Sequence, residues 1–327
     1  MLRIMDNINK VSVIIPIYGV EKYIERCARS LFQQTMKTGI EFIFVNDATM
    51  DNSMEILRRV ISEFPTRKDQ IKIINHEENR GLAAVRKTGI KSASGEYVIH
   101  CDSDDWVEPN MYELMYDEAK RVDADIVGCD IYEEFNDRTS LLKQEFNLPP
   151  HEQAVIVMNV GSRRIERYLW NRLIRKETYL RLGFDNPNIN LWEDVSITIP
   201  LHIISSRVGY VNKPLYHYNR ANVNSLVSSF NEDKLAQLIT VSEYLNKYVM
   251  LLPNYKEYKP YMDNRLLSAK LHYLTDKLVY NPNKWRKLWP NLDISNYPSR
   301  PMRFLMRCAS CHLDFIVKGA QMILNLN

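Results

Sequence analysis

The chain has 327 residues, enough for one large domain or two smaller ones. Its 45% hydrophobic and 25% charged residues are ordinary for a globular protein, and a formal net charge of +3 gives no reason to expect a nucleic-acid partner. Residues 1–10 lack the apolar core of a signal peptide, and no uninterrupted apolar run is long enough to span a bilayer. Together with an odd number of cysteines, 5, these features predict reduced thiols and a cytoplasmic location.

The first part of the chain alternates short apolar segments with amphipathic ones. Apolar residues recur at helical spacing after Tyr23, Ser53, Gly81 and Pro109. Strands that alternate with amphipathic helices indicate βαβ units, and therefore a mostly parallel sheet with right-handed crossovers. The segments that predict strands are 11–16, 41–47, 71–74, 97–101 and 125–129.

Acidic residues follow two of these predicted strands. Asp47 ends the second, while Asp102, Asp104 and Asp105 follow the fourth. Ligands of open α/β sheets bind beyond the carboxyl ends of the strands. Carboxylates crowded there repel one another, so a hard divalent cation that also binds phosphate oxygens is the expected partner. The alternative is a solvated acidic turn before a helix, which an isolated Asp-x-Asp pattern favours.

The rest of the chain is less regular at first and helical later. Residues 133–165 have no clear periodicity and predict an excursion from the domain or a flexible loop. Regular structure is predicted again at 168–174. Glu193 and Asp194 are predicted in the first turn of a helix, and an amphipathic helix is predicted from Met302 to Leu326. Extended segments are predicted at 208–211 and 215–218. The predicted domains are 1–225, with a nucleotide half at about 10–130 and an acceptor half at about 165–225, and a helical extension at 226–327.

Two common nucleotide-binding loops are absent from the sequence. A dinucleotide fingerprint would place Gly-x-Gly-x-x-Gly after the first strand, where residues 17–21 read Ile-Tyr-Gly-Val-Glu. A Gly-x-x-x-x-Gly-Lys phosphate loop is also absent. A bound nucleotide would therefore be held by carboxylates and a metal, which indicates a metal-dependent user of nucleoside diphosphate or triphosphate compounds.

Four separated pieces of this sequence, in the same order, resemble the family-2 inverting glycosyltransferases of the GT-A fold. The pieces are 11–18, 44–53, 79–86 together with 100–107, and 191–194. The resemblance covers about residues 10–225 and implies an α/β fold, a Rossmann-like mostly parallel sheet flanked by helices. It also implies transfer of a hexosyl or N-acetylhexosaminyl group from a nucleotide-sugar donor, with UDP-sugars favoured. The implied acceptor is a saccharide or lipid-linked saccharide of surface polysaccharide synthesis.

The resemblance implies a donor site. Tyr18 would stack on the base, and Asp47 would bond the base or ribose. Arg86 would reach the base or pyrophosphate, while Asp102 would hold the ribose or a metal-bound water. A half-buried tyrosine, a turn cap and a surface arginine are the ordinary alternatives for the first three. The remaining donor-binding residues implied are Pro16, Arg220 and Ser225.

The resemblance also implies a metal and a base. Asp104, with Asp102, would bind Mn²⁺ or Mg²⁺, and His217 is a candidate third ligand whose alternative is a hydrogen-bonded strand histidine. Asp194 would be the general base, because inversion needs one carboxylate opposite the leaving group and no nucleophilic side chain. Glu193 is the fallback base, and Trp192 is placed on the acceptor side. Acidic residues that favour a helix dipole are the alternative for both carboxylates.

Four positions depart from the family pattern. Gly19 stands where Asn is usual, Asn46 replaces one of a frequent Asp pair, Ala48 replaces Gly, and Lys87 replaces Asn. The metal-binding acid and the base are retained, so an active enzyme is expected. The alternatives are a metal-dependent nucleotidyltransferase, which would carry a Gly- and Lys-rich loop near the first strand, and an inactive sugar-nucleotide-binding assembly subunit.

The C-terminal tail contains two further patterns. Residues 308–312 spell Cys-x-x-Cys-His, the haem-attachment pattern, but without a secretion signal core or interface cysteines are the preferred interpretation. The tail also combines cations with apolar residues, so it could contact an anionic membrane at the inner face, the alternative being a helix packed on its own domain. The cations are Arg300, Arg303, Arg307 and Lys318.

Overall fold

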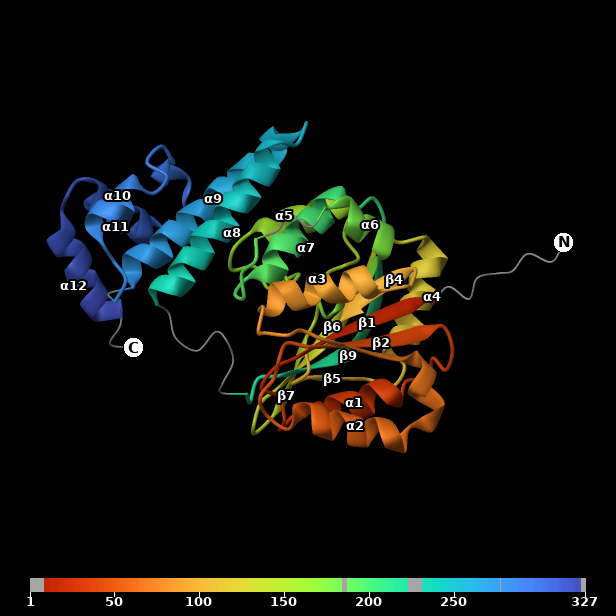
Figure 1. Cartoon of the computed structure of the whole chain (residues 1–327). Coiled ribbons are helices and arrows are strands. Elements are labelled where there is room, and N and C mark those ends of the chain that lie inside the picture. The colour runs from red at the N-terminus through yellow and green to blue at the C-terminus, as the bar shows by residue number, and fades with distance from the viewer. Residues whose placement is uncertain (1–8, 184–186, 223–230, 277, 325–327) are drawn as a thin grey trace. The chain divides into compact units, whose positions relative to one another are not determined.

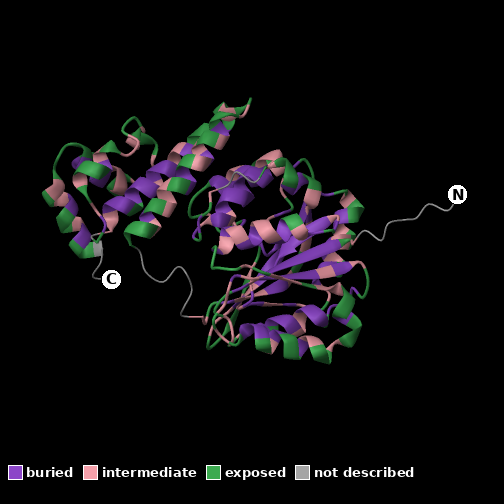
Figure 2. Ribbon diagram, in the orientation of Figure 1, coloured by how far each residue is buried: buried purple, intermediate pink, exposed green. Residues whose placement is uncertain are grey.

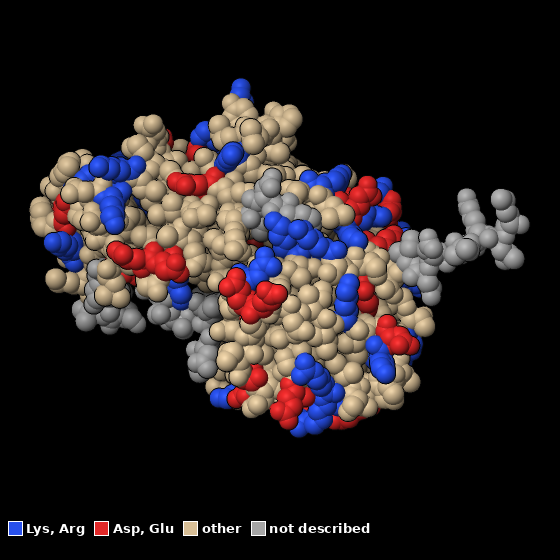
Figure 3. Space-filling view, in the orientation of Figure 1, with Lys and Arg blue, Asp and Glu red and all other residues tan. Residues whose placement is uncertain are grey.

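The computed structural model describes residues 9–183, 187–222, 231–276 and 278–324. Its contacts divide the chain into two compact units (Figure 1). The α/β unit comprises Met1–Ala154 and Arg163–Asn224, and the helical unit comprises Val155–Ser162 and Ser225–Asn327. Positive and negative side chains are interspersed over the face of the α/β unit seen in Figure 3, as expected from the small net charge.

One half of the sheet is parallel, as the sequence predicted. Its strands lie side by side in the order β3-β2-β1-β4. They are β1 (Val11–Ile17), β2 (Ile40–Asn46), β3 (Ile71–Asn75) and β4 (Tyr97–His100). The helical segments between them are α1 (Ile24–Phe32), α2 (Ser53–Glu63), the 3-10 helix η1 (Pro65–Gln70) and α3 (Leu82–Ser92).

The other half of the sheet is mixed. β8 lies next to β4 and is antiparallel both to it and to the following strand, β6. β6 pairs parallel with β9, and β9 pairs antiparallel with β5. β4 and β6 therefore run parallel to each other, as successive βαβ units up to residue 129 predict, but β8 lies antiparallel between them. The sequence did not predict this insertion, because an apolar strand pattern does not specify its neighbour. These strands are β5 (Trp106–Val107), β6 (Ile126–Glu134), β7 (Thr139–Leu142), which pairs with β6, β8 (Arg172–Arg175) and β9 (Val208–Asn219).

The predicted loop at 133–165 instead contains regular structure, namely β7 and the helix α5 (Pro150–Met158). The prediction was wrong there because a four-residue strand and a helix without a distinct polar face leave no clear periodicity. The remaining helices of the α/β unit are α4 (Met111–Val122), α6 (Lys176–Arg181) and α7 (Glu193–Ile204).

Helices cover both faces of the sheet (Figure 1). The core on one face contains residues of α1, α2 and α4, and the core on the other contains residues of α3, α6 and α7. Within β1, Val13 and Ile15 belong to the first core and Ile14 to the second, as the alternation of a strand requires. The central strands are consequently buried along their length (Figure 2), which explains their continuous apolar sequences.

Two glycines position α3. Gly81, which precedes the helix, has a φ of +83°, and a Cβ atom there would lie 2.2 Å from Asn190 Oδ1. A Cβ on Gly89 would lie 2.3 Å from Cγ2 of Ile14, so the helix approaches β1 more closely than any other residue would permit. Arg86 lies between these two positions.

The helical unit confirms the prediction of a helical C-terminal region. Its core includes Leu267, Met306 and the fully buried Trp285, whose Nε1 donates to the Lys270 carbonyl at 2.8 Å. None of the described helices is long and apolar enough to cross a membrane. The elements are α8 (Glu232–Met250), α9 (Tyr255–Thr275), α10 (Pro282–Lys287), η2 (Ile294–Asn296), α11 (Arg300–Ser310) and α12 (Asp314–Leu324).

The predicted C-terminal helix is in fact two helices. A turn separates α11 from α12, where His312 has a φ of +61° and the Leu313 amide donates to the Cys308 carbonyl at 2.8 Å. Cys308 is buried in the helical unit, while Cys311 is exposed. The amphipathic pattern continued through the break because both helices bury one face.

Candidate functional site

Arg86 joins three segments that are distant in sequence. Its side chain, 4% exposed, donates from one terminal nitrogen to Asp102 Oδ1 at 3.0 Å. Its Nε donates to Glu193 Oε1 at 3.1 Å. Thus α3, the loop after β4 and the start of α7 meet at one guanidinium. We call Asp102, Asp104, Glu193 and Asp194, together with Arg86, the acidic site.

Burial shifts the ionisation of the acidic site. It raises the pKa of Glu193 to about 7, although Arg86 opposes the shift, and it also raises the pKa of Asp194. Burial, followed by the Asp102 carboxylate, raises the pKa of Asp104. Burial lowers the pKa of Arg86, but the Asp102 and Glu193 carboxylates outweigh it and leave that pKa above its ordinary value. Three carboxylates, those of Asp102, Glu193 and Asp194, act on the one guanidinium of Arg86, and this excess of negative charge favours a further cation.

The loop that contains Asp102 is held by β9. The Tyr216 hydroxyl accepts from the Asp102 amide at 3.1 Å and donates to Asp105 Oδ2 at 2.7 Å. The Asn219 amide donates to Asp105 Oδ1 at 2.7 Å. Both oxygens of the buried Asp105 are therefore engaged by β9, so this residue anchors the loop rather than capping a turn.

Asp104 faces a different set of partners. Its Oδ2 accepts from the Asn222 side chain at 2.8 Å, and the Asn222 oxygen accepts from the Tyr23 hydroxyl at 3.3 Å. The Asp104 carbonyl accepts from Arg26 at 3.2 Å. The guanidinium of Arg26 also lies 3.5 Å from the centre of the Trp106 ring. Asp104 is thus held from α1 and from the segment that follows β9.

His217 contacts two carboxylates that are not members of the acidic site. Its Nδ1 lies 2.7 Å from Glu134 Oε1 and its Nε2 lies 2.9 Å from Glu108 Oε1. Its ring stacks between Trp106 and Tyr132, with centroids 4.9 and 4.8 Å away. The structure therefore contains the strand histidine with hydrogen-bonded partners, and a role for His217 as a third metal ligand stays a prediction. Within the described ranges, no group of three or more His, Cys, Asp or Glu side chains is arranged to hold a metal.

Asp47 and Tyr18 differ in accessibility. Asp47 is buried, and its two oxygens accept from the amides of Arg80 at 2.9 Å and Gly81 at 2.8 Å. Its Oδ1 also lies 2.7 Å from His76 Nδ1. Asp47 therefore fixes the loop that leads into α3, whereas Tyr18, 55% exposed just after β1, is accessible to a planar ligand.

The start of α7 is strained. Trp192 has a φ of +62°, a conformation that costs a bulky residue about 1–2 kcal/mol. The Ser196 hydroxyl donates to the Glu193 carbonyl at 2.6 Å, and the Val195 amide donates to Asp194 Oδ1 at 2.7 Å. The turn at Trp192 sets the direction in which both acidic side chains leave the helix, and such strain is characteristic of functional sites.

The remaining predicted residues are less central. Pro16 lies within β1 and pairs with Val45, rather than ending the strand. Arg220 is half-exposed, with its guanidinium 5.3 Å from the centre of the Tyr218 ring and its Nε 3.9 Å from Glu133 Oε1. Ser225 lies outside the described residues.

An aromatic stack supports the site and was not foreseen. Trp170 stacks between Tyr168, at 4.4 Å, and Tyr216, at 4.1 Å. The sequence contained a usable signal, because strand alternation places Tyr216 and His217 on opposite faces of β9.

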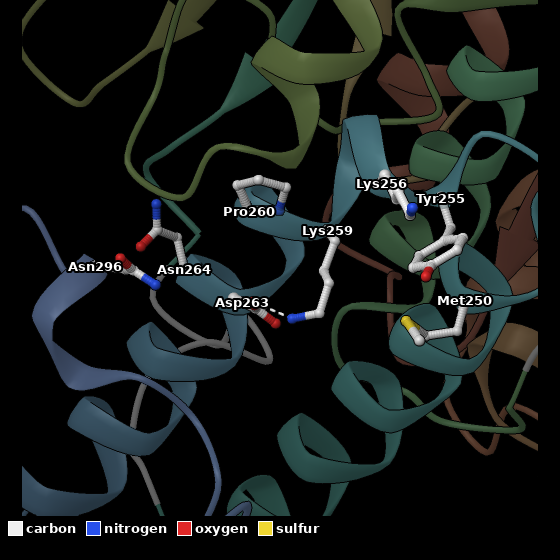
Figure 4. A pocket seen from close by; sticks show the side chains of 8 residues that line it. All are labelled: Met250, Tyr255, Lys256, Lys259, Pro260, Asp263, Asn264 and Asn296. Atoms are coloured by element: carbon white, nitrogen blue, oxygen red, sulfur yellow. Dashed lines mark hydrogen bonds and ion pairs between the residues drawn. The ribbon is translucent and has the colours of Figure 1, made fainter.

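Two cavities are lined by residues outside the acidic site. The cavity in the helical unit measures about 630 Å³, and in it Lys259 forms an ion pair with Asp263 (Figure 4). It is lined by Met250, Tyr255, Lys256, Lys259, Pro260, Asp263, Asn264 and Asn296. A cavity of about 360 Å³ beside α3 is lined by Arg80, Ala83, Ala84, Lys87, Thr88, Lys91, Pro187 and Asn188.

The sequence profile of Glycosyl transferase family 2 matches residues 12–191, which include the acidic loop and end just before α7. The chain belongs to glycosyl transferase family 2. The resemblance seen in the sequence is thereby confirmed. The uncharacterized glycosyltransferase EpsJ of Bacillus subtilis is 36% identical over 222 residues, which are 66% of this chain and 62% of EpsJ. This family-2 chain therefore spans less than two thirds of that relative.

Solved structures confirm the GT-A fold. S. aureus TarS 1–349, in complex with UDP-GlcNAc, has a TM-score of 0.65 at 17% identity, covering 95% of this chain and 89% of that one. The mannosyltransferase PcManGT of Pyrobaculum calidifontis, in complex with GDP-Man and Mn²⁺, has a TM-score of 0.51 at 17% identity, covering 97% and 87%. The likeness to TarS extends beyond residue 225, where the sequence showed no resemblance.

Proposed function

We propose that this chain transfers a sugar, with inversion, from a nucleotide-sugar donor to an acceptor hydroxyl. The observation that carries the proposal is the guanidinium of Arg86, which holds Asp102 of the donor-side loop and Glu193 of α7 in one site. Inverting transfer needs a donor site and one carboxylate base on opposite sides of the reacting sugar. Family membership and the fold support this reaction over nucleotidyl transfer.

Asp194 is the base in this proposal. Glu193 is bound to Arg86 at 3.1 Å, so an acceptor hydroxyl would have to compete with this ion pair for its carboxylate. Asp194 forms no ion pair with any described residue and accepts only from the adjacent Val195 amide. Burial raises the pKa of Asp194, which makes its carboxylate a stronger base toward the acceptor hydroxyl. Trp192, immediately before these residues, would line the acceptor side.

Asp102 and Asp104 would hold Mn²⁺ or Mg²⁺ together with the donor diphosphate. Both offer hard oxygen ligands. Burial and then the neighbouring Asp102 carboxylate raise the pKa of Asp104, and a divalent cation would offset both effects. When bound, the metal would stabilise the charge on the departing diphosphate. The complexes of TarS with UDP-GlcNAc and of PcManGT with GDP-Man and Mn²⁺ support a hexosyl or N-acetylhexosaminyl donor. UDP-sugars are the first choice.

The roles of the remaining predicted donor-binding residues are proposed from where each lies in the structure. Tyr18 would stack on the base, and Arg86 and Arg220 would act near the diphosphate, while Asp47 would act chiefly by fixing the loop before α3. Ser225, which lies outside the described residues, keeps its predicted role beside the diphosphate. The proposed acceptor is a saccharide or lipid-linked saccharide of surface polysaccharide synthesis, so the working location is the cytoplasm or the inner face of its membrane.

A donor panel tests the proposal. The protein is incubated with UDP- and GDP-sugars and Mn²⁺, and nucleoside diphosphate release and thermal stabilisation are measured. Asp194→Asn should keep donor stabilisation but lose turnover by about 10²–10⁴-fold. Asp104→Asn should lose the metal-dependent part of the stabilisation. The proposal fails if no nucleotide sugar stabilises the protein, and an inactive subunit is indicated if donors bind without turnover by the unmodified chain.

A further inference from the structure

Helices α11 and α12 each bury one face and expose another apolar one. Leu305, Met306 and Val317 pack in the core of the helical unit. These helices therefore do pack on their own unit, as one interpretation of the sequence proposed. Several large apolar side chains nevertheless stay exposed: Phe304 (60%), Phe315 (72%), Met322 (67%) and Ile323 (68%).

Cations alternate with the exposed apolar residues. Arg300, Phe304 and Arg307 follow one another at intervals of four and three residues along α11, so they share one side of the helix. Phe315, Lys318 and Met322 do the same along α12, with Ile323 beside them. We call these seven residues the basic–apolar surface.

The charge of this surface has one sign. Asp314 is the only acidic residue within α11 and α12, and it is half-buried and bound to Arg286 at 2.7 Å. Arg300, Arg307 and Lys318 are exposed and form no ion pair in the part of the chain that the structure describes. The basic–apolar surface therefore presents cations beside aromatic and aliphatic side chains. An exposed carboxylate outside the two helices, that of Asp293, lies close enough to Arg307 for the guanidinium to help lower the pKa of Asp293.

This combination has the composition of a helix that binds at a membrane interface. Amphipathic helices that bind at a membrane interface have Lys and Arg on their polar side and Phe, Leu or similar residues that enter the headgroup region. Anionic headgroups attract each nearby cation.

We propose that the basic–apolar surface docks this chain peripherally on an anionic lipid bilayer. Phe304 and Phe315 would enter the headgroup region, while Arg300, Arg307 and Lys318 would contact anionic headgroups. Only one amphipathic patch is involved, so the attachment is reversible and sensitive to salt. The inference goes beyond the proposed sugar transfer and does not depend on it.

Vesicle flotation of the full chain tests the proposal. Vesicles that contain phosphatidylglycerol should retain the protein at low salt, and phosphatidylcholine vesicles should retain much less. Each cation removed should weaken binding by about fivefold, the equivalent of about 1 kcal/mol. Lys318→Gln therefore gives a modest loss, and Lys318→Glu with Phe315→Ser gives a large one. Because these side chains are exposed, the variants should keep the thermal midpoint of the unmodified chain.

Matched controls come from the same unit. Leu251, 76% exposed, and Lys256 provide the changes Leu251→Ser and Lys256→Glu, which should leave flotation unchanged. Equal retention of the Phe315 and control variants would overturn the proposal, as would equal retention on neutral and anionic vesicles. Light scattering provides a separate check: a dimer that Phe315→Ser dissociates would identify the surface as a contact between copies. Transfer to a soluble acceptor should be the same in all these variants, so the two proposals can fail independently.

Discussion

Replacing Arg86 by methionine should reveal how far the acidic site depends on one guanidinium. The change keeps most of the buried volume but leaves the carboxylates of Asp102 and Glu193 without their shared partner. Breaking a buried ion pair by removing one partner costs about 3–5 kcal/mol. Since Asp102 is partly exposed, we expect the lower value, about 3 kcal/mol, which corresponds to a fall in Tm of roughly 6–12 °C.

The loss should depend on pH in a definite direction. Burial raises the pKa of Glu193 to about 7 in the folded chain, above its ordinary value of 4.5, so the folded state binds this proton more tightly. A raised carboxyl pKa lowers the free energy of unfolding as pH rises from the unfolded pKa to the folded one. Without Arg86 the folded pKa rises further, so the additional loss from Glu193 appears above about pH 7 and is absent at about pH 5.5.

Urea unfolding at these two pH values measures both effects. Arg80→Met is the matched control, because Arg80 is an exposed arginine just before the same helix, and it should change stability by no more than about 0.5 kcal/mol. The reasoning is refuted if Arg86→Met costs less than about 1 kcal/mol, or if its cost is the same at about pH 5.5 and about pH 8.5.

Two other substitutions test the backbone and the support of the site. Ala48→Gly should stabilise the chain by about 0.5 kcal/mol in urea unfolding, because Ala48 has a φ of +55°, whereas Ala84→Gly within α3 should cost about 1 kcal/mol. Tyr216→Phe should cost about 1–3 kcal/mol and raise the KM for the donor, because the Asp102 amide and Asp105 lose their shared hydroxyl. Tyr218→Phe, whose hydroxyl contacts only the half-exposed Arg220 among the described residues, should cost less.

The parallel half of the fold was predictable because each element carries its own local pattern. β1 and β2 are apolar on both sides, and α1 and α2 each bury one face along successive turns, so their type and order could be inferred without tertiary information. The mixed half was not predictable in the same way. The tertiary structure determines which strands lie beside β8, and the sequence of its four residues does not predict them.

The members of the acidic site were predicted, but their contacts were not. Asp102, Arg86 and Glu193 were recognised as separate pieces of a family pattern, whereas the ion pair between Arg86 and Glu193 spans 107 residues and depends on how α3 and α7 cover the same face of the sheet. His217 was selected for its chemistry alone. Its position between Glu108 and Glu134 follows from the pairing of β9, which no local pattern specifies.

The register of β9 determines how the acidic site is assembled. Tyr216 and Asn219 hold the loop of Asp105, while His217, on the opposite face, pairs with Trp106. A shift of one residue in this strand would exchange the two faces and remove the hydroxyl from beneath the Asp102 amide. The partners of that hydrogen bond lie 114 residues apart, so the loop can take its binding shape only after β9 has joined the sheet between β6 and β5. A sequence motif for the acidic loop is therefore necessary for this site but not sufficient, since its geometry is imposed by a strand outside the motif.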